Sequence, residues 1–256
     1  MKEVWQYREL FFFMVWRDVK IRYKQTLLGA SWAIIQPFFT MIVFTIFFGR
    51  LAKMPSDGIP YPIFSYSALL PWTFFAGALN LSGNSLVVNS NLITKVYFPR
   101  ITIPAAAVFS GLVDFAIAFT VLLGMMVYYQ IEFTWGLLMW PLLLIPLVLV
   151  ALGVGMILSS LNVKYRDIKY TIPFGIQLWL FLTPVIYPTS IIPERFRFLA
   201  ALNPLTGLIE TFRATILPGR EVNLHGLLIS LAVSVMLFVA GFVYFRKTER
   251  NFADII

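Results

Sequence analysis

Cysteine is absent from the 256 residues of the chain, and histidine occurs once, as His225. Without cysteine the chain can form no disulfide or cysteine–zinc site, and it cannot use a thiol nucleophile. A single histidine also excludes a metal site built from several histidines of one chain. The sequence therefore predicts no metal centre.

Charged residues are scarce, at 12% of the chain, whereas soluble domains average about 25%. The twelve acidic residues are scattered, so no carboxylate cluster supports a membrane-embedded glycosyltransferase. The patterns G-x-x-x-x-G-K-[ST], H-E-x-x-H and G-x-S-x-G are also missing. We therefore expect a non-catalytic chain that binds no nucleotide or other cofactor itself.

Apolar residues, in contrast, make up 59% of the chain and fall in long runs, with a mean hydropathy of +0.82. Lipid can cover that much apolar surface, whereas one soluble core cannot. The sequence predicts an all-α, polytopic membrane protein with one transmembrane domain, 1–256, and six membrane-spanning helices. The predicted spans are 31–49, 64–88, 103–128, 137–161, 170–187 and 224–245.

The net charge of +8 fits a membrane protein better than a nucleic-acid partner, because the cations sit in short loops between the spans. With the N-terminus inside, fourteen of the twenty Lys and Arg residues lie on the inner side. This bias predicts that both termini are cytoplasmic. We expect no secretory signal peptide, because no small-residue cleavage site follows the first apolar run.

Residues 1–30 are expected to form an amphipathic helix in the headgroup region rather than a span. Apolar residues recur on one helical face: Trp5, Phe12, Trp16, Val19 and Tyr23. Cations follow on the same segment, and we assign them to the membrane interface: Arg17, Lys20, Arg22 and Lys24. A soluble helix packed on a partner is the alternative.

Residues 189–223 are too polar to span a membrane, yet they carry regularly spaced Leu, Ile and Phe residues. This pattern favours short helices that re-enter the outer face of the membrane, ahead of the last span and the tail at 224–256. Two amphipathic helices resting on the outer surface are the alternative.

Asp114 is the only ionisable residue deep within a predicted span, which makes it a functional candidate. A carboxylate hydrogen-bonded between helices is the simpler interpretation. An ion-coupled secondary transporter would need several such groups and usually an internal repeat, and neither is visible.

A polar stripe in the second span recurs at three- and four-residue spacing, through Thr73, Gly77, Asn80 and Asn84. Small and amide residues of this kind favour close helix packing over a transport pathway.

Aromatic residues form 17% of the chain, and several lie away from the span ends where aromatics normally anchor. For any one of them, core or lipid contact is the simpler interpretation. Together they suit a path on which sugar rings could stack, with Phe38, Phe39, Trp72 and Trp179 as candidates.

The inner segment 89–103 mixes two cations with apolar residues, and Pro99 prevents a long helix. Such a segment could dock into a groove on a cytosolic partner. A plain connecting loop is the alternative.

Several long blocks resemble the permeases of type-2 ABC exporters for polysaccharides. They are RDVKIRYKQTLLGASWAIIQP (17–37), YSALLPWTFFAGAL (66–79), LITKVYFPRITIP (92–104), NVKYRDIKYTIPFGIQLWLFLTPVIYP (162–188), LNPLTGLIETFR (202–213) and FRKTERNFADII (245–256). The resemblance covers nearly the whole chain.

The resemblance implies that the chain is a half-transporter in the bacterial inner membrane. Two copies of it would form the channel, and two copies of a cytosolic P-loop ATPase that binds ATP and Mg²⁺ would dock on them. It implies a lipid-linked polysaccharide as cargo, O-antigen first, with capsule, teichoic acid or a small molecule as alternatives.

It also assigns site residues in three groups. The ATPase-coupling residues are Lys95, Val96, Tyr97, Phe98, Pro99 and Arg100. The candidate glycan channel residues are Phe38, Phe39, Trp72, Thr73, Asn80 and Trp179. The outer gate residues are Glu194, Arg195, Glu210 and Arg213.

Overall fold

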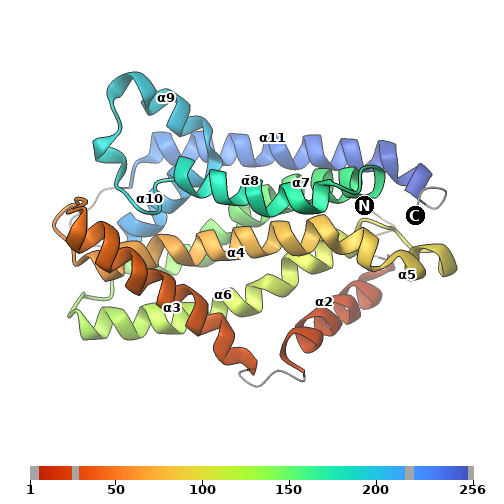
Figure 1. Ribbon diagram of the computed structural model, residues 1–256, viewed down its shortest axis with the longest axis horizontal. Helices are drawn as coiled ribbons and strands as arrows, with labels where there is room; N and C mark the ends of the chain where they lie inside the picture. The colour runs from red at the N-terminus through yellow and green to blue at the C-terminus, as the bar shows by residue number, and fades with distance from the viewer. Residues whose placement is uncertain (1–5, 25–28, 217–221, 253–256) are drawn as a thin grey trace.

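The computed structural model describes residues 6–24, 29–216 and 222–252, and over these ranges the chain is helical without any strand. Most of the long helices lie roughly along the long axis of an elongated molecule, while α2 and α3 cross it obliquely (Figure 1). The N-terminal helix α2, the short helix α5 and the end of α11 lie toward one end of this axis, and α9 and α10 lie toward the other.

Long helices and short connecting helical turns alternate along the chain. The α-helices are α2 (Arg8–Tyr23), α3 (Trp32–Phe44), α4 (Tyr61–Val88), α5 (Ser90–Lys95), α6 (Thr102–Tyr128), α7 (Trp140–Lys164), α8 (Ile168–Leu182), α9 (Glu194–Leu202), α10 (Pro204–Ile216) and α11 (Leu224–Thr248). Short 3-10 or π segments join or extend them: η1 (Gly29–Ser31), η2 (Thr45–Leu51), η3 (Trp135–Met139), η4 (Thr189–Ile191) and η5 (Glu249–Asn251).

Within the described ranges, five helical segments are long and apolar enough to cross a membrane. They are Gly29–Leu51, Tyr61–Val88, Thr102–Tyr128, Trp135–Lys164 and Leu224–Thr248. The prediction of an all-α polytopic membrane protein is confirmed. The remaining predicted span corresponds to α8, which has 15 residues and is therefore about 22 Å long, shorter than a hydrocarbon core of about 30 Å.

The last part of that predicted span is not helical. The helix ends at Leu182, and residues 183–186 form a buried segment that contains Pro184. Proline disfavours helical backbone at the residue before it, which explains why the helix stops there.

Helix α4 is the centre of the molecule, and 78% of its most apolar window is buried. It packs against α6, α7, α3, α8 and α10. Helices α7 and α11 form another close pair, lying side by side in Figure 1. A Cβ added to Gly241 of α11 would overlap the carbonyl oxygen of Gly153, so the two backbones can touch only because a side chain is missing at this crossing.

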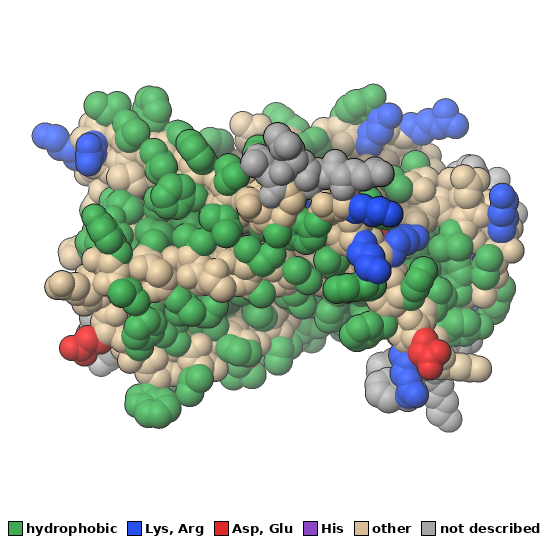
Figure 2. All heavy atoms as spheres, turned by 90° about the horizontal axis from the view of Figure 1, so that it is seen from below, with side chains coloured by type: hydrophobic (Ala, Val, Ile, Leu, Met, Phe, Trp, Pro, Cys, Tyr) green, Lys and Arg blue, Asp and Glu red, His purple; other side chains and the backbone are tan. Residues whose placement is uncertain are grey.

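The surface is arranged as expected for a protein in a bilayer. Figure 2 shows charged side chains toward the two ends of the long axis, with a wide hydrophobic band between them. Helices α3 and α11, together with the π segment η2 that extends α3, turn many large apolar side chains outward, including Phe39, Phe47, Leu228 and Met236. In water this surface would be costly, whereas lipid covers it.

Helix α2 has two apolar sides. Met14 (1% exposed) and Val19 pack inward, and the Phe11 ring meets Phe109 of α6 edge to face. Phe12 (76% exposed) and Trp16 point outward. The helix is therefore attached to the bundle while offering aromatic rings to its surroundings, so the predicted apolar face is divided between the two sides. Its place in the membrane interface stays a prediction. Trp5 lies outside the described residues.

Candidate functional site

The main cavity in the described part of the chain has a volume of about 850 Å³ and lies between α2, α3, α4, α6 and α8. Its polar lining consists mostly of neutral side chains: Gln36, Thr40, Thr73, Asn80 and Gln177. Aromatic rings lie among them: Trp32, Trp72, Phe74 and Phe115. Amides and hydroxyls that hydrogen-bond, together with flat rings, are a surface that suits a sugar polymer.

The polar stripe of α4 mostly faces this cavity. Thr73, Gly77 and Asn80 line it, whereas the side-chain oxygen of Asn84 accepts a hydrogen bond from Asn162 of α7 at 3.1 Å. The packing interpretation of the stripe is therefore right for Asn84. The other three residues line the cavity instead of a helix contact within this chain.

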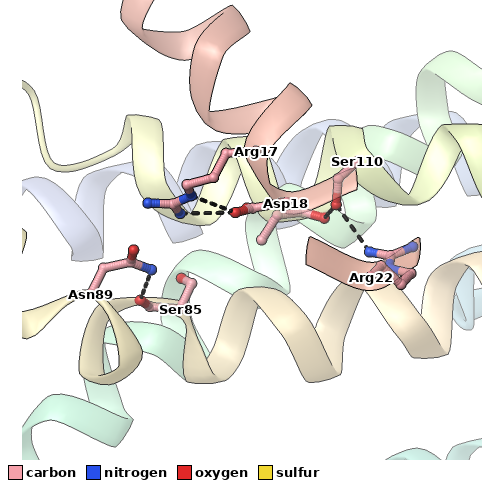
Figure 3. Close-up of polar contacts among 7 residues, drawn as sticks. Arg17, Asp18, Arg22, Ser85, Asn89 and Ser110 are labelled. Atoms are coloured by element: carbon pink, nitrogen blue, oxygen red, sulfur yellow. Dashed lines mark hydrogen bonds and ion pairs between the residues drawn. The ribbon is translucent and has the colours of Figure 1, made fainter. Parts of the chain in front are cut away.

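Two charged residues also line the cavity, and they neutralise each other. Asp114 of α6 forms an ion pair with Arg22 of α2 and accepts a hydrogen bond from the hydroxyl of Tyr23. Arg22 also donates to the hydroxyl of Ser110 at 3.1 Å, as Figure 3 shows. Burial lowers the pKa of Arg22 and raises that of Tyr23, yet both keep their usual forms at neutral pH.

Asp114 therefore joins helices α2 and α6, as the simpler interpretation of its place within a span suggested. Arg22 was predicted to face lipid headgroups, but its side chain turns inward to Asp114. Sequence reasoning missed this pair because the two residues lie 92 positions apart and no local pattern connects them.

The other three predicted interface cations keep away from the cavity. Arg17 pairs with the adjacent Asp18 at 2.8 Å, as Figure 3 shows. Lys20 lies over the ring of Trp16, 5.5 Å from its centroid, and Lys24 is exposed at the end of α2. These positions are compatible with contact to headgroups.

The predicted aromatic channel residues divide into two groups. Trp72 lines the cavity, together with the predicted polar residues Thr73 and Asn80. Phe38 and Phe39 lie exposed on α3, outside the lining. Trp179 lies behind the lining, where its ring meets Phe75 at 5.0 Å and its Nε1 donates to Asn203 at 3.1 Å.

Several cavity residues were not predicted, and two of them carried a usable signal. Gln36 and Gln177 are amides within apolar helices, a placement that is costly in lipid and so indicates a polar pathway. Trp32, Phe74 and Phe115 gave no comparable signal, because aromatic residues are common throughout the chain.

The predicted coupling segment 95–100 begins at the last residue of α5, at the end of the molecule that also holds the end of α11 (Figure 1). Lys95, Val96 and Tyr97 are exposed, with Tyr97 at 88%. Phe98 is buried, at 4%, Pro99 is partly buried, and Arg100 donates to the backbone carbonyl of Glu249. One half of the segment is thus available for contact, and the other half anchors it.

The predicted outer gate residues have different environments. Glu194 and Arg197 pair at 3.5 Å on exposed α9, Arg195 lies over the ring of Phe196, and Glu210 is partly buried in α10. Arg213 is 1% exposed and lies with its guanidinium 3.8 Å from the centroid of the Phe64 ring.

Arg213 supports the non-helical segment after α8. It donates to the carbonyl oxygens of Pro184 and Val185, both at 2.7 Å, and to that of Phe64 at 3.3 Å. The hydroxyl of Tyr61 donates to the carbonyl of Ile186 at 2.7 Å. Non-helical backbone can exist at membrane depth where protein groups such as these, or a water-filled cavity, satisfy its polar groups. Re-entry of α9 and α10 into the membrane remains a prediction.

Within the described residues, no group of three or more His, Asp or Glu side chains could hold a metal ion. The cavity therefore offers hydrogen bonding and stacking, and the ion pair of Arg22 with Asp114 lies at the contact of α2 and α6.

Comparison with known proteins gives a consistent result. The family model described as ABC-2 type transporter matches residues 9–217, a range that contains the cavity, the coupling segment and the outer helices. The O-antigen export system permease protein RfbA of Myxococcus xanthus is 29% identical over 259 residues, spanning 100% of this chain and 98% of that protein. RfbA of Klebsiella pneumoniae is 29% identical over 244 residues, 94% of this chain and 92% of that protein. The polysialic acid transport protein KpsM of Escherichia coli is 24% identical over 246 residues, 91% of each chain.

Proposed function

This chain belongs to the ABC-2 type transporter family, and from that premise we propose that it is the permease subunit of an ATP-driven polysaccharide exporter. The cargo is a lipid-linked polysaccharide, O-antigen first, that moves from the cytoplasm across the bacterial inner membrane. The main structural support for this proposal is the cavity, whose lining combines neutral hydrogen-bonding side chains with aromatic rings. Relatives named as O-antigen export permeases align along almost the whole chain, which supports the same cargo.

The chain needs an external source of energy, because its sequence contains no P-loop. A separate cytosolic ATPase, present in two copies and holding ATP and Mg²⁺, supplies it. The exposed residues Lys95, Val96 and Tyr97 offer this partner a protruding surface with one cation, one aliphatic side chain and one aromatic ring. ATP binding pulls or pushes this segment and thereby moves α4 and α6, which it connects.

A second copy of the chain completes the pathway. The cavity of one chain is bordered by α3 and α8, whose exposed side chains include Phe39, Phe174, Leu178 and Phe181. The polar cavity thus lies between two apolar helix surfaces. We infer that these surfaces of one copy meet those of the second copy, so that the two cavities form one path. Phe38 and Phe39 would then lie near the contact between the copies.

Both termini lie in the cytoplasm in this proposal, so that α5 meets the ATPase and α9 and α10 lie outside. The chain has no cysteine, so single cysteines can be placed at Tyr97 and Phe198 without background labelling. A membrane-impermeant maleimide added to intact spheroplasts should label position 198 and leave position 97 unlabelled until the membrane is opened. The reverse pattern would contradict this orientation.

Reconstitution tests the proposed function directly. The chain is purified with its ATPase, inserted into proteoliposomes and supplied with radiolabelled lipid-linked glycan on the ATPase side. We expect ATP-dependent appearance of the label on the opposite side, and none with a non-hydrolysable nucleotide. ATP-independent transport that an uncoupler abolishes would instead support an ion-coupled transporter.

A capsule polymer is the second candidate cargo, and a specific observation favours it. The KpsM relatives, named for polysialic acid transport, align over 91% of the chain. Offering O-antigen and capsule-type lipid-linked glycans to the same proteoliposomes distinguishes the two.

A further inference from the structure

The end of the described chain packs against the segment predicted to contact the ATPase. Helix α11 is followed by η5 (Glu249–Asn251) and Phe252, and we call Glu249, Phe252 and the backbone between them the tail clamp. The side chain of Phe252 is 2% exposed and meets the ring of Phe245 of α11 edge to face at 5.4 Å. The tail is therefore held against the bundle over the residues described.

Two kinds of contact join the tail clamp to the coupling segment. The guanidinium of Arg100 donates to the backbone carbonyl of Glu249, a charge-assisted bond to a carbonyl near the end of a helix. Phe98 and Ile93 belong to the same apolar cluster as Phe252 and Phe245. The two segments are about 150 residues apart in sequence.

The clamp itself is held in place by a further ion pair. The side chain of Glu249 accepts a hydrogen bond from Arg246, one turn earlier on α11, at 2.7 Å. The side chain of Glu249 is thus tied to α11, while its carbonyl faces Arg100. These contacts attach the residues after α11 to the helix and to the coupling segment.

The coupling segment needs such a support. Helix α5 has only six residues, too few for a helix to be stable by itself in water, and it is followed by non-helical backbone. Its orientation must therefore come from tertiary contacts, which Phe98 and Arg100 supply on the side of the tail clamp. Lys95, Val96 and Tyr97 remain exposed.

We propose that the tail clamp is a positioning element that sets the angle at which residues 95–97 meet the ATPase and links that contact to α11. This proposal rests on the proposed function, because it takes the ATPase as the partner of the segment. Movement of the coupling segment then reaches three membrane helices, α4, α6 and α11, instead of the two that it connects directly.

The first test replaces Phe252 by Ala and compares it with Phe252→Leu and with Phe133→Ala, which removes an exposed ring elsewhere. A spin label on a cysteine at position 97 reports local motion, and transport per ATP hydrolysed, measured in the same variants with Tyr97 intact, reports coupling. We expect Phe252→Ala to mobilise the label and to lower coupling about two- to thirtyfold, the usual range for mutations that alter the coupling between two sites. Phe252→Leu should keep most of the coupling and leave the label nearly as immobile as in the unmodified chain. Phe133→Ala should change neither the motion of the label nor the coupling.

A second variant keeps the test decisive if Phe252→Ala does not fold. Arg100→Cys removes the guanidinium that donates to the Glu249 carbonyl, and Glu249→Cys removes the ion pair with Arg246. A short bis-maleimide between the two cysteines can then join the coupling segment and the tail clamp covalently in the same folded sample. We expect weak coupling before cross-linking and recovery after it. Full coupling without the tether, or no recovery with it, would overturn the proposal. Failure of the unmodified chain to bind any ATPase would instead refute the proposed function.

Discussion

Asp114 illustrates how a carboxyl group can lie in an apolar helix when side chains of another helix reach it. Its carboxylate is not a lone buried group, because Arg22 and Tyr23 of α2 both reach it. A buried ion pair adds little net stability compared with apolar packing, but removing one partner leaves the other charge without compensation. The pair therefore fixes how α2 sits against α6.

We expect Asp114→Asn to lower the stability of the protein by about 2 kcal/mol, because Arg22 would then keep a partly buried charge without a partner. Thermal unfolding in detergent measures this effect. Asp18→Asn is the matched control: it breaks a carboxylate–arginine pair of similar exposure that lies within α2 and joins no second helix, so it should cost only about 0.5 kcal/mol. Equal losses in both variants would show that the pair does not hold the two helices together.

Arg213 is the second charged residue whose contacts explain a local structure. It donates to three backbone carbonyls and covers the ring of Phe64, so the non-helical segment after α8 depends on it. Lysine could not replace it, since a point-like ammonium does not offer the flat fork that serves adjacent carbonyls.

Arg213→Met should therefore destabilise the protein by about 3–5 kcal/mol, because it leaves buried carbonyls without donors. Limited proteolysis near residues 183–192 should become faster. Arg195→Met, on the exposed helix α9, should have little effect on either measurement. A stable Arg213→Met variant with unchanged proteolysis would refute this role.

At the scale of elements, sequence patterns predicted long apolar helices better than their surroundings. Lipid imposes length and hydropathy on a span, and these are local properties that a window of sequence contains. The end of α8 was harder to predict, because the backbone that follows it is supported by Arg213 and Tyr61, which lie far away in sequence. The faces of α4 were also misjudged, because a polar stripe looks the same whether a helix or a cavity faces it.

Helix α4 gives a test of the cavity. Asn80→Leu and Thr73→Val remove polar groups that line it, so we expect export to fall about tenfold while insertion and ATPase binding stay normal. Asn84→Leu breaks the hydrogen bond to Asn162 and should instead lower stability by about 1 kcal/mol. Normal export in the Asn80 and Thr73 variants would exclude this cavity from the pathway.

The coupling segment gives a test of its two sides. Tyr97→Ala should weaken ATPase binding, measured by co-purification, and leave the melting temperature unchanged, because its ring is exposed. Phe98→Ala should lower the melting temperature, since removal of a buried ring costs about 3–5 kcal/mol. If Tyr97→Ala binds the ATPase normally, the exposed side is not the docking surface.

At the scale of the whole molecule, the resemblance seen in the sequence blocks is confirmed by the family match over residues 9–217. The blocks could indicate the family because they are long and keep their order along the chain. They could not indicate the cavity, because its lining comes from five separate helices whose arrangement in space no single block contains. On the face shown in Figure 2, charged side chains lie toward the two ends of the molecule with a hydrophobic band between them, which suits a membrane subunit driven from outside the bilayer.

Deletion of the gene, followed by analysis of surface and cytoplasmic glycans, tests the central claim most directly. The proposed function predicts that lipid-linked polymer accumulates inside the cell and that the polymer disappears from the surface. The wild-type gene should restore the polymer to the surface. The chemistry of the accumulated polymer would then identify the cargo. Unchanged surface glycan with no accumulation, in a strain without a second exporter, would contradict polysaccharide export and favour a small-molecule cargo.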